Sequence, residues 1–235
     1  MITASMSSST AAQSSKPMEP WEASFFEQVL RARRIAADRP ITIRRCGPRN
    51  TDRDRRTSPD DIHATVATTR AQHKEAAELV RQRYEWRGYL TTNVSDDSPT
   101  DPRPSNTLIA IRRDTVVGSM TLGFDGDHGL LLDHTYPQEI GEVRRRGRTI
   151  CELTRLAVTS NSGSRRILSA MFGLAYRVGR AERGSSDLYI EVNPRHAPVY
   201  CKLFGFVAAS EVRLCGRVNA LVCCCTWTSS AWTLA

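Results

Sequence analysis

The sequence predicts one α/β domain built on a mixed central sheet. Strand-like and helix-like segments alternate from residue 61 onward, which is typical of helices packed against a sheet. Two adjacent strand patterns around Arg113-Asp114 indicate a hairpin, so part of the sheet is expected to be antiparallel. The chain has 235 residues, 40% of them hydrophobic, which suits one domain with a sizeable core and terminal tails.

The first 60 residues differ in composition and are expected to form an extension outside the domain. Residues 1–20 are rich in Ser, Ala and Thr and are predicted to be disordered. Residues 21–38 have an apolar side suited to one amphipathic helix, and an Arg-rich linker follows. From Arg31 to Asp60 there are ten Arg against four Asp, so most of the formal charge of +8 lies in this extension. We therefore place the folded domain at residues 61–235.

The first half of the domain is expected to contain a strand, a helix and the hairpin. Apolar residues alternate weakly over 62–68 and follow helical spacing over 71–86. A Pro- and Asp-rich loop is expected over 91–106, and loops of this length in compact domains are often functional. The two hairpin strands are predicted over 107–112 and 116–124.

The second half is expected to alternate between helices and strands. A loop over 126–133 opens it. The expected helices are 137–146, 165–180 and a third that opens at Asn193-Pro194 and closes at Gly205. The expected strands are 150–158, 187–192 and one or two within 214–227.

Composition argues against several other classes of protein. No apolar run approaches the ~18 residues of a membrane helix, and the N-terminus lacks the apolar region of a signal peptide, so we expect a cytoplasmic protein. The seven cysteines show neither a Cys-x-x-Cys pair nor another metal-binding spacing, so no metal site is expected. Cys223, Cys224 and Cys225 are consecutive and should alternate between the two faces of a strand as small buried side chains.

The segment Glu152-Leu153-Thr154-Arg155 places charged residues inside an apolar strand. In a regular strand Glu152 and Thr154 share one face, and Leu153 and Arg155 share the other. A carboxylate or a guanidinium is expensive to bury unpaired, so each needs a partner, either a structural ion pair or a substrate. Glu152 and Arg155 are therefore candidate site residues.

A short polar loop, Asn161-Ser162-Gly163-Ser164, leads from this strand into the helix over 165–180. Backbone N–H groups and the positive dipole end at such a helix start bind phosphates readily. Arg165 and Arg166 would add positive charge. An ordinary helix cap explains the same residues equally well.

The run from Val192 to Phe206 carries a resemblance to a known family. A strand ends in Asn193, and the helix that follows contains Tyr200 and leads to Gly205-Phe206. Together with the preceding strand, loop and helix, this run resembles the thioester-binding half of GNAT acyltransferases. The resemblance implies a GNAT-like (acyl-CoA N-acyltransferase) fold, in which two adjacent parallel strands splay apart and the pantetheine arm of the donor lies between them. The strands here would be 152–158 and 187–192.

Further motifs narrow the resemblance. The Glu-x-Thr-Arg-Leu-Ala-Val motif that begins at Glu152 is similar to acyl-homoserine lactone synthases and to long-chain N-acyl amino acid synthases of the FeeM type. The Gly-Leu-Leu-Leu-Asp run ending at Asp133 and the Asn-Pro-Arg-His-x-x-x-Tyr run ending at Tyr200 look closer to the FeeM-type enzymes. The similarity covers roughly residues 62–227. It implies transfer of a long-chain acyl group from an acyl carrier protein, or from acyl-CoA, to the amine of an amino acid, with no tightly bound cofactor.

The resemblance also suggests roles for individual residues. Glu152 would be the general base, acting through a water, and Tyr200 the acid toward the leaving thiolate. Arg155 would orient Glu152 or hold the carboxylate of the acceptor. The donor would be held by Leu156, Ala157, Val158, Gly163, Arg165, Arg166 and Asn193. The first three of these would also offer backbone N–H groups to the oxyanion. Near the end of the first helix, Arg81, Arg83, Tyr84 and Trp86 compete for a substrate-binding role, and Arg83, Tyr84 and Trp86 are taken as the candidates.

Two further sequence features each have a structural and a functional interpretation. His196 lies at a helix start, away from the expected gap, and is expected to be structural. A basic cluster precedes the central strand and is either a solvated face or a docking surface for an acidic carrier protein. The cluster consists of Arg144, Arg145, Arg146 and Arg148.

Several other functions compete with the FeeM-type reading. They are an acetyl-CoA-dependent GNAT acetyltransferase, an acyl-homoserine lactone synthase and a catalytically inactive GNAT-like binding module. A nucleic-acid-binding module is a further alternative, because the sequence pI is near 9.4. The excess charge lies in the extension, however, and no nucleic-acid-binding motif is apparent, so no nucleic-acid partner is expected.

Overall fold

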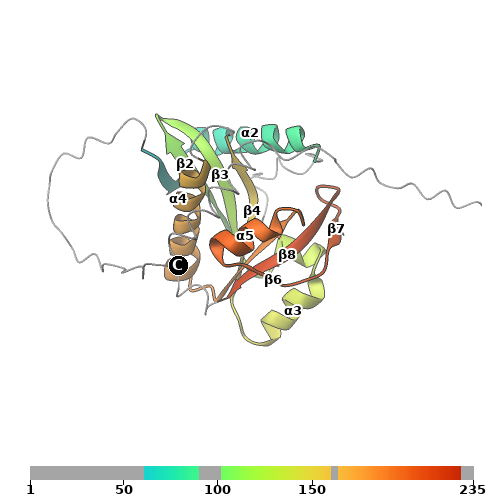
Figure 1. The fold of residues 1–235 in the computed structure, drawn as a ribbon. Coiled ribbons are helices and arrows are strands. Elements are labelled where there is room, and N and C mark those ends of the chain that lie inside the picture. The colour runs from blue at the N-terminus through green and yellow to red at the C-terminus, as the bar shows by residue number, and fades with distance from the viewer. Residues whose placement is uncertain (1–60, 90–101, 160–163, 229–235) are drawn as a thin grey trace, which may run out of the picture.

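Eight strands form one mixed sheet in the computed structural model of the protein, which describes residues 61–89, 102–159 and 164–228. The sheet order is β1-β2-β3-β4-β5-β8-β6, and β7 pairs with β8 outside this order (Figure 1). Strands β4 and β5 are parallel, and the other pairs are antiparallel. The N-terminal extension and the helix predicted over 21–38 lie outside the described residues.

Strands and helices follow one another largely in the predicted order, and the mixed sheet flanked by helices confirms the predicted fold class. The strands are β1 (His63–Val66), β2 (Ser105–Arg112), β3 (Thr115–Phe124), β4 (Ile150–Val158), β5 (Asp187–Val192), β6 (Val207–Ala208), β7 (Arg213–Cys215) and β8 (Ala220–Thr228). The helices are α2 (Arg70–Arg87), the 3₁₀ helix η1 (Leu131–His134), α3 (Pro137–Arg145), α4 (Ser164–Tyr176), the π-helix η2 (Arg177–Glu182) and α5 (Ala197–Phe204).

Three local features differ from the predicted boundaries. The segment predicted as a loop over 126–133 contains the start of η1, and the helix predicted over 165–180 changes from α to π at Arg177. Helix α5 begins later than Asn193-Pro194 because a turn occupies that step. In this turn Asn193 accepts hydrogen bonds from the backbone N–H groups of Arg195 and His196, at 3.2 and 2.8 Å.

The sheet separates two groups of helices. Helices α4 and α5 pack on one face, whereas α2, α3 and η1 pack on the other. The strands alternate accordingly: Cys223 and Cys225 lie in the core under α4 and α5, and Cys224 lies in the core beside α3. This confirms the predicted alternation of the three consecutive cysteines.

Two irregularities in the sheet coincide at β4. Strands β4 and β5 are paired from Ile150–Asp187 to Leu153–Ile190 and no further, although both continue beyond that point. On its other edge, β4 has a bulge, because Arg155 and Leu156 together face one residue of β3. Arg155 has a φ of 52° within this bulge. The predicted splay between two parallel strands is therefore confirmed, and we call the opening the fork.

Packing of α4 against β3 depends on the lack of a side chain at Gly118. A Cβ atom at this position would lie 2.7 Å from both Ile167 Cγ2 and Met171 Sδ of α4. We expect Gly118→Ala to lower the free energy of unfolding by about 1–3 kcal/mol, measured by urea denaturation, because α4 must move outward. Gly173→Ala, in the same helix with open space around it, is the control and should be neutral or stabilising. Equal effects of both changes would contradict this account.

Candidate functional site

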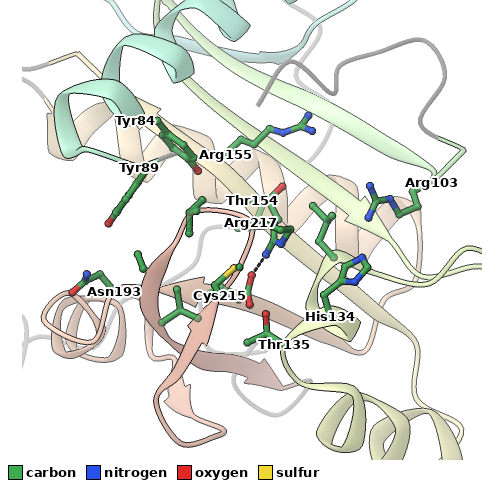
Figure 2. Close-up of a pocket in the computed structure, with 17 residues that line it drawn as sticks. Tyr84, Tyr89, Arg103, His134, Thr135, Thr154, Arg155, Asn193, Cys215 and Arg217 are labelled. Carbon is green, nitrogen blue, oxygen red and sulfur yellow. Dashed lines mark hydrogen bonds and ion pairs between the residues drawn. The ribbon is translucent and has the colours of Figure 1, made fainter. Parts of the chain in front are cut away.

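Cavities meet at the fork between β4 and β5. The largest, of about 630 Å³, is lined by residues of α2, η1, β4, β5 and the β7–β8 hairpin (Figure 2). A second, of about 140 Å³, passes between the separated strands and has Tyr84 and Tyr200 in its wall. A third, of about 160 Å³, continues between α2 and α5 along the outer part of β4. Their shared lining residues make them parts of one site.

Glu152 is buried beside this site, with only 3% of its surface exposed. Its two carboxylate oxygens accept hydrogen bonds from the backbone N–H groups of Leu131 and Leu132, at 2.7 and 3.0 Å. Burial raises the pKa of Glu152 to about 7, against the opposing effect of these two hydrogen bonds. A carboxyl group with this pKa can both accept and release a proton near neutral pH.

A small cavity of about 30 Å³ connects Glu152 with its surroundings. Glu152, Thr154, Arg155 and Arg103 are among its lining residues. The volume suits one water molecule, and the walls are polar enough to bind it. Thr154 and Arg155 border the same cavities, contrary to the predicted alternation of faces, because the bulge interrupts the regular strand at Arg155.

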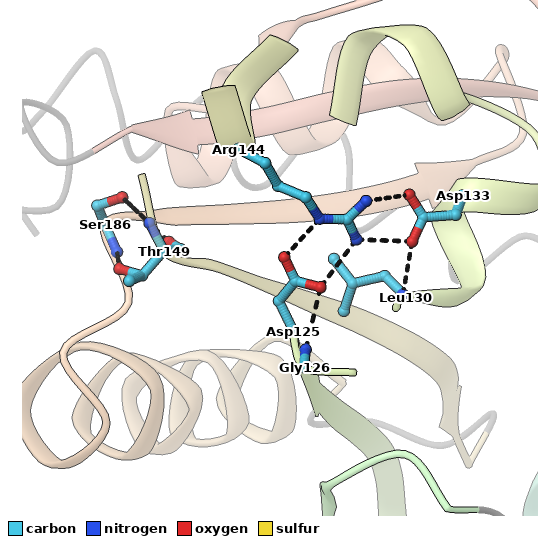
Figure 3. Close-up of polar contacts among 7 residues, drawn as sticks. All are labelled: Asp125, Gly126, Leu130, Asp133, Arg144, Thr149 and Ser186. Atoms are coloured by element: carbon cyan, nitrogen blue, oxygen red, sulfur yellow. Dashed lines mark hydrogen bonds and ion pairs between the residues drawn. The ribbon is translucent and has the colours of Figure 1, made fainter. Parts of the chain in front are cut away.

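The backbone that holds Glu152 is itself fixed by a charged cluster. Arg144 of α3 binds Asp125 and Asp133 through four hydrogen bonds of 2.6–2.8 Å (Figure 3). Asp133 also accepts a hydrogen bond from the Leu130 N–H at 2.7 Å. Burial alone would raise the pKa of Asp133, but its bonds to Arg144 and Leu130 outweigh this effect and lower it. The ionised cluster thereby ties η1 to α3 and to the end of β3.

The basic cluster predicted before β4 is largely neutralised by neighbouring carboxylates. Arg144 pairs with Asp125 and Asp133, and Arg148 pairs with the buried Asp187. The remaining two, Arg145 and Arg146, pair with Glu142. The reading of these arginines as a free basic docking surface is therefore wrong for Arg144 and Arg148, which hold the fold together.

Tyrosine side chains form one wall of the fork. Tyr84 and Tyr89 lie at the C-terminal end of α2, and Tyr200 projects from α5. Burial raises the pKa of Tyr84 to about 12 and also raises the pKa of Tyr200. Both hydroxyl groups therefore stay protonated near neutral pH and can donate hydrogen bonds to a ligand in the fork.

Known proteins share the fold that carries this site. The family model described as N-acyl amino acid synthase FeeM matches residues 75–227. The chain belongs to this FeeM family. The FeeM structure, an N-acyl amino acid synthase from uncultured soil microbes, superimposes with a TM-score of 0.67 at 22% identity, covering 74% of this chain and 93% of that chain. The protein is therefore an acyltransferase with a GNAT fold.

More distant structures agree on the fold. Arabidopsis thaliana NAA60, in complex with acetyl-CoA, matches with a TM-score of 0.52 at 11% identity over 72% of this chain and 99% of that chain. Escherichia coli ElaA matches with a TM-score of 0.50 at 10% identity over 71% and 98%. No curated protein matches the chain. Among the described residues, no helix has the length and apolarity needed to cross a membrane.

His196 lies inside the site of this FeeM family member, so its predicted position away from the gap is wrong. The turn at Asn193 carries the start of α5 inward, and His196 lines both the 140 and the 160 Å³ cavities. Its Nε2 atom is buried and has no hydrogen-bond partner among the described residues. Burial lowers the pKa of His196 to about 4, helped by the charges of Arg87 and Arg195, so the imidazole is neutral near pH 7.

The other predicted site residues fall into two groups. Those that line the cavities are Arg83, Tyr84, Arg155, Leu156, Ala157, Val158, Asn193 and Tyr200. Trp86 is not among the residues that line these cavities, and it stacks instead under Arg83 and Arg87. Arg166 is exposed and lies 3.7 Å from Asp61. Arg165 has buried Nε and Nη2 atoms without a hydrogen-bond partner in the described part of the chain, and Gly163 lies outside it.

Sequence reasoning missed most of the residues that line the largest cavity, and four of them bear on the chemistry of the site. They are Tyr89, Arg103, Glu191 and Arg217. Glu191 alternates with the apolar residues of β5, a pattern that also describes an ordinary solvent-facing position. Arg103 and Arg217 lie outside regular elements, where periodicity gives no signal.

The burial of Glu152 should make stability depend on pH. Because its folded-state pKa is about 7 and its ordinary value is 4.5, ionisation opposes folding. Relative to Glu152→Gln, the wild-type free energy of unfolding should fall as pH rises from about 4.5 through about 7, by about 3 kcal/mol at most. Urea denaturation of both proteins across this range measures the difference. A difference that is constant with pH would contradict the burial argument.

The unpartnered nitrogen of His196 gives a second prediction. Since an unsatisfied buried polar atom opposes folding, His196→Leu should retain or increase the free energy of unfolding, by up to about 1–3 kcal/mol. The same change should raise the KM for the acyl donor, because the imidazole lines the fork. Arg195→Gln, on the exposed neighbour, is the control for stability. A loss of stability with unchanged KM would identify a structural histidine.

Proposed function

We propose that this acyltransferase moves a long-chain acyl group from the thioester of an acyl carrier protein to the amine of an amino acid. The observation that carries the proposal is the fork, where connected cavities run between two separated parallel strands beside a buried carboxylate. A combined cavity of this size lies in the usual range for a small-molecule site. Membership of the FeeM family supports an amino acid as the acceptor.

The reaction forms one bond and breaks another. The neutral amine attacks the thioester carbonyl carbon, a C–N bond forms, and the C–S bond breaks to release a thiolate. The amine gives up a proton, and the thiolate finally gains one. An enzyme accelerates this step by holding both reactants in contact, by receiving the amine proton and by stabilising the oxyanion.

Glu152 receives the amine proton in this proposal. Its two oxygens are already bonded to backbone N–H groups, so direct contact with the amine is hindered. A water in the 30 Å³ cavity can relay the proton from the large cavity to the carboxylate. Arg155 borders both cavities and can orient that water through its guanidinium group.

Tyr200 stabilises the leaving thiolate. Because burial raises the pKa of its hydroxyl group, full proton transfer to a thiolate is uphill, whereas a hydrogen bond to the thiolate is favourable. The outer part of β4 supplies the oxyanion donors, since its edge toward β5 is no longer paired beyond Leu153. The backbone N–H groups of Leu156 and Val158 are the candidates, because that of Ala157 points to the other edge of the strand, where β4 is paired with β3.

The donor is held by its pantetheine arm in the fork and by its phosphate near α4. Arg165 at the start of α4 has two buried guanidinium nitrogens without a partner in the described residues. A phosphate at the helix start would satisfy them. Acyl carrier protein and acyl-CoA both carry phosphopantetheine, so this contact serves either donor. We favour the carrier protein because the resemblance of the motifs around Glu152 and Tyr200 to FeeM-type enzymes implies this donor.

Product analysis by mass spectrometry tests the proposal. The protein is incubated with a mixture of amino acids and with either long-chain acyl carrier protein or long-chain acyl-CoA, in separate reactions. We expect an N-acyl amino acid from the carrier-protein donor. If product forms only from acyl-CoA, then acyl-CoA and not the carrier protein is the donor. The absence of an amide product from both donors would overturn the proposed function.

Removing the base should slow turnover while leaving the fold intact. For Glu152→Gln we expect kcat to fall by about 10²–10⁴-fold, because the water in the small cavity loses its proton acceptor. In the wild type, kcat should rise with pH through about 7 as Glu152 ionises. Glu182→Gln, at an exposed position of η2, is the matched control. A Glu152→Gln enzyme with wild-type kcat would remove Glu152 from the mechanism.

A further inference from the structure

Glu191 is a second buried carboxylate at the fork. The last pair between β4 and β5 is Leu153–Ile190, and Glu191 follows directly after it. If the same register continued, Glu191 would lie opposite Thr154. On its other side it pairs with Cys224 of β8. Its side chain is 8% exposed, yet it lines both the 630 and the 140 Å³ cavities. The mechanism above gives it no role.

Arg217 accompanies Glu191 from the β7–β8 hairpin. Its Nη2 atom donates a hydrogen bond to Glu191 Oε2, and Figure 2 shows the labelled arginine reaching into the cavity. The second oxygen of Glu191, Oε1, and the Nε atom of Arg217 are buried and have no hydrogen-bond partner in the described parts of the chain. One acceptor and one donor are thus left unsatisfied in a single ion pair that borders the largest cavity.

Burying an ion pair in this way is unfavourable unless its remaining polar atoms find partners. Removing the two charges from water opposes folding, and each unsatisfied atom adds to that cost. A ligand that supplies both a donor and an acceptor would remove this cost. An α-amino acid has both groups on one carbon atom, as its amino N–H groups and its carboxylate oxygens.

We propose that Glu191 and Arg217 bind the acceptor amino acid, with Glu191 Oε1 accepting from its α-amino group and Arg217 Nε donating to its α-carboxylate. This inference rests on the proposed function and names the residues that select the acceptor. The position of Glu191 at the fork places the amine where the separated strands would admit the thioester. Glu191 and Glu152 lie on the same face of the sheet, so the amine remains within reach of the relay to Glu152.

The arrangement predicts selection for a free carboxylate. The wild-type enzyme should prefer an amino acid over its methyl ester and over the corresponding decarboxylated amine. In Arg217→Gln the KM for the amino acid should rise about ten- to a hundredfold, the range expected for loss of a charged hydrogen bond. The KM values for the ester and the amine should rise much less, because these acceptors have no carboxylate for Arg217 to bind, and the KM for the acyl donor should stay the same. Glu191→Gln should raise the KM for all three acceptors, because each has an amino group.

Arg213→Gln is the matched control. Arg213 belongs to the same hairpin and pairs with Glu139, but it is not among the residues that line the cavities. If Arg217→Gln only loosened the hairpin, Arg213→Gln would share its effect. Unchanged carboxylate selection in Arg217→Gln would overturn the proposal. If selection is instead lost in Arg155→Gln, then Arg155 and not Arg217 binds the carboxylate.

A binding experiment separates this inference from the proposed function. Saturation-transfer NMR of free amino acids with the wild type, Arg217→Gln and Glu191→Gln needs no acyl donor. Binding that depends on both residues, without acylation of any amine, would leave the inference standing while the proposed function fails. If the wild type acylates amino acids and Arg217→Gln keeps the same carboxylate selection, the proposed function stands and the inference fails.

Discussion

The carboxylate of Glu152, held between two backbone N–H groups, is the interaction around which the site is arranged. Its charge is stabilised by Leu131 and Leu132 and destabilised by burial, and the balance leaves a pKa of about 7. The Glu152 side chain has space because Gly123 lies opposite it on β3. A Cβ atom at Gly123 would lie 3.2 Å from Glu152 Cγ and 3.3 Å from Glu152 Oε1. A larger residue at this position would push the carboxylate away from η1.

Strand β4 connects this carboxylate to the ligand cavities. It loses its pairing with β5 after Leu153 and bulges against β3 at Arg155. A non-glycine residue with a positive φ is strained by about 1–2 kcal/mol, and pairing with β3 on either side of the bulge holds it in place. The bulged backbone turns Arg155 toward the same cavities as Thr154, which a regular strand would not allow.

The sequence predicted the helices and strands better than it predicted which residues come together at the site. An apolar run identified β4, a period-two pattern identified β5, and the motif around Glu152 identified the family, because these signals are local. The partners of Glu152 lie 20 and 21 residues away, in a segment expected to be a loop, so no local pattern reveals them. The position of His196 was misjudged because one turn at Asn193 redirects α5. Arg217 carries no periodic signal at all, since it lies between two short strands.

The charged groups that line the largest cavity bear on the acceptor that we propose. Three guanidinium groups line it, from Arg103, Arg155 and Arg217, against the one carboxylate of Glu191. Near neutral pH the neighbouring imidazole of His196 is neutral, and Glu152 is only partly ionised. Within this lining Arg217 and Glu191 are already paired with each other, so their two charges offset each other. The proposed acceptor satisfies this pair at both ends, because its amino group donates to Glu191 Oε1 and its carboxylate accepts from Arg217 Nε, the two atoms that lack partners in the described residues.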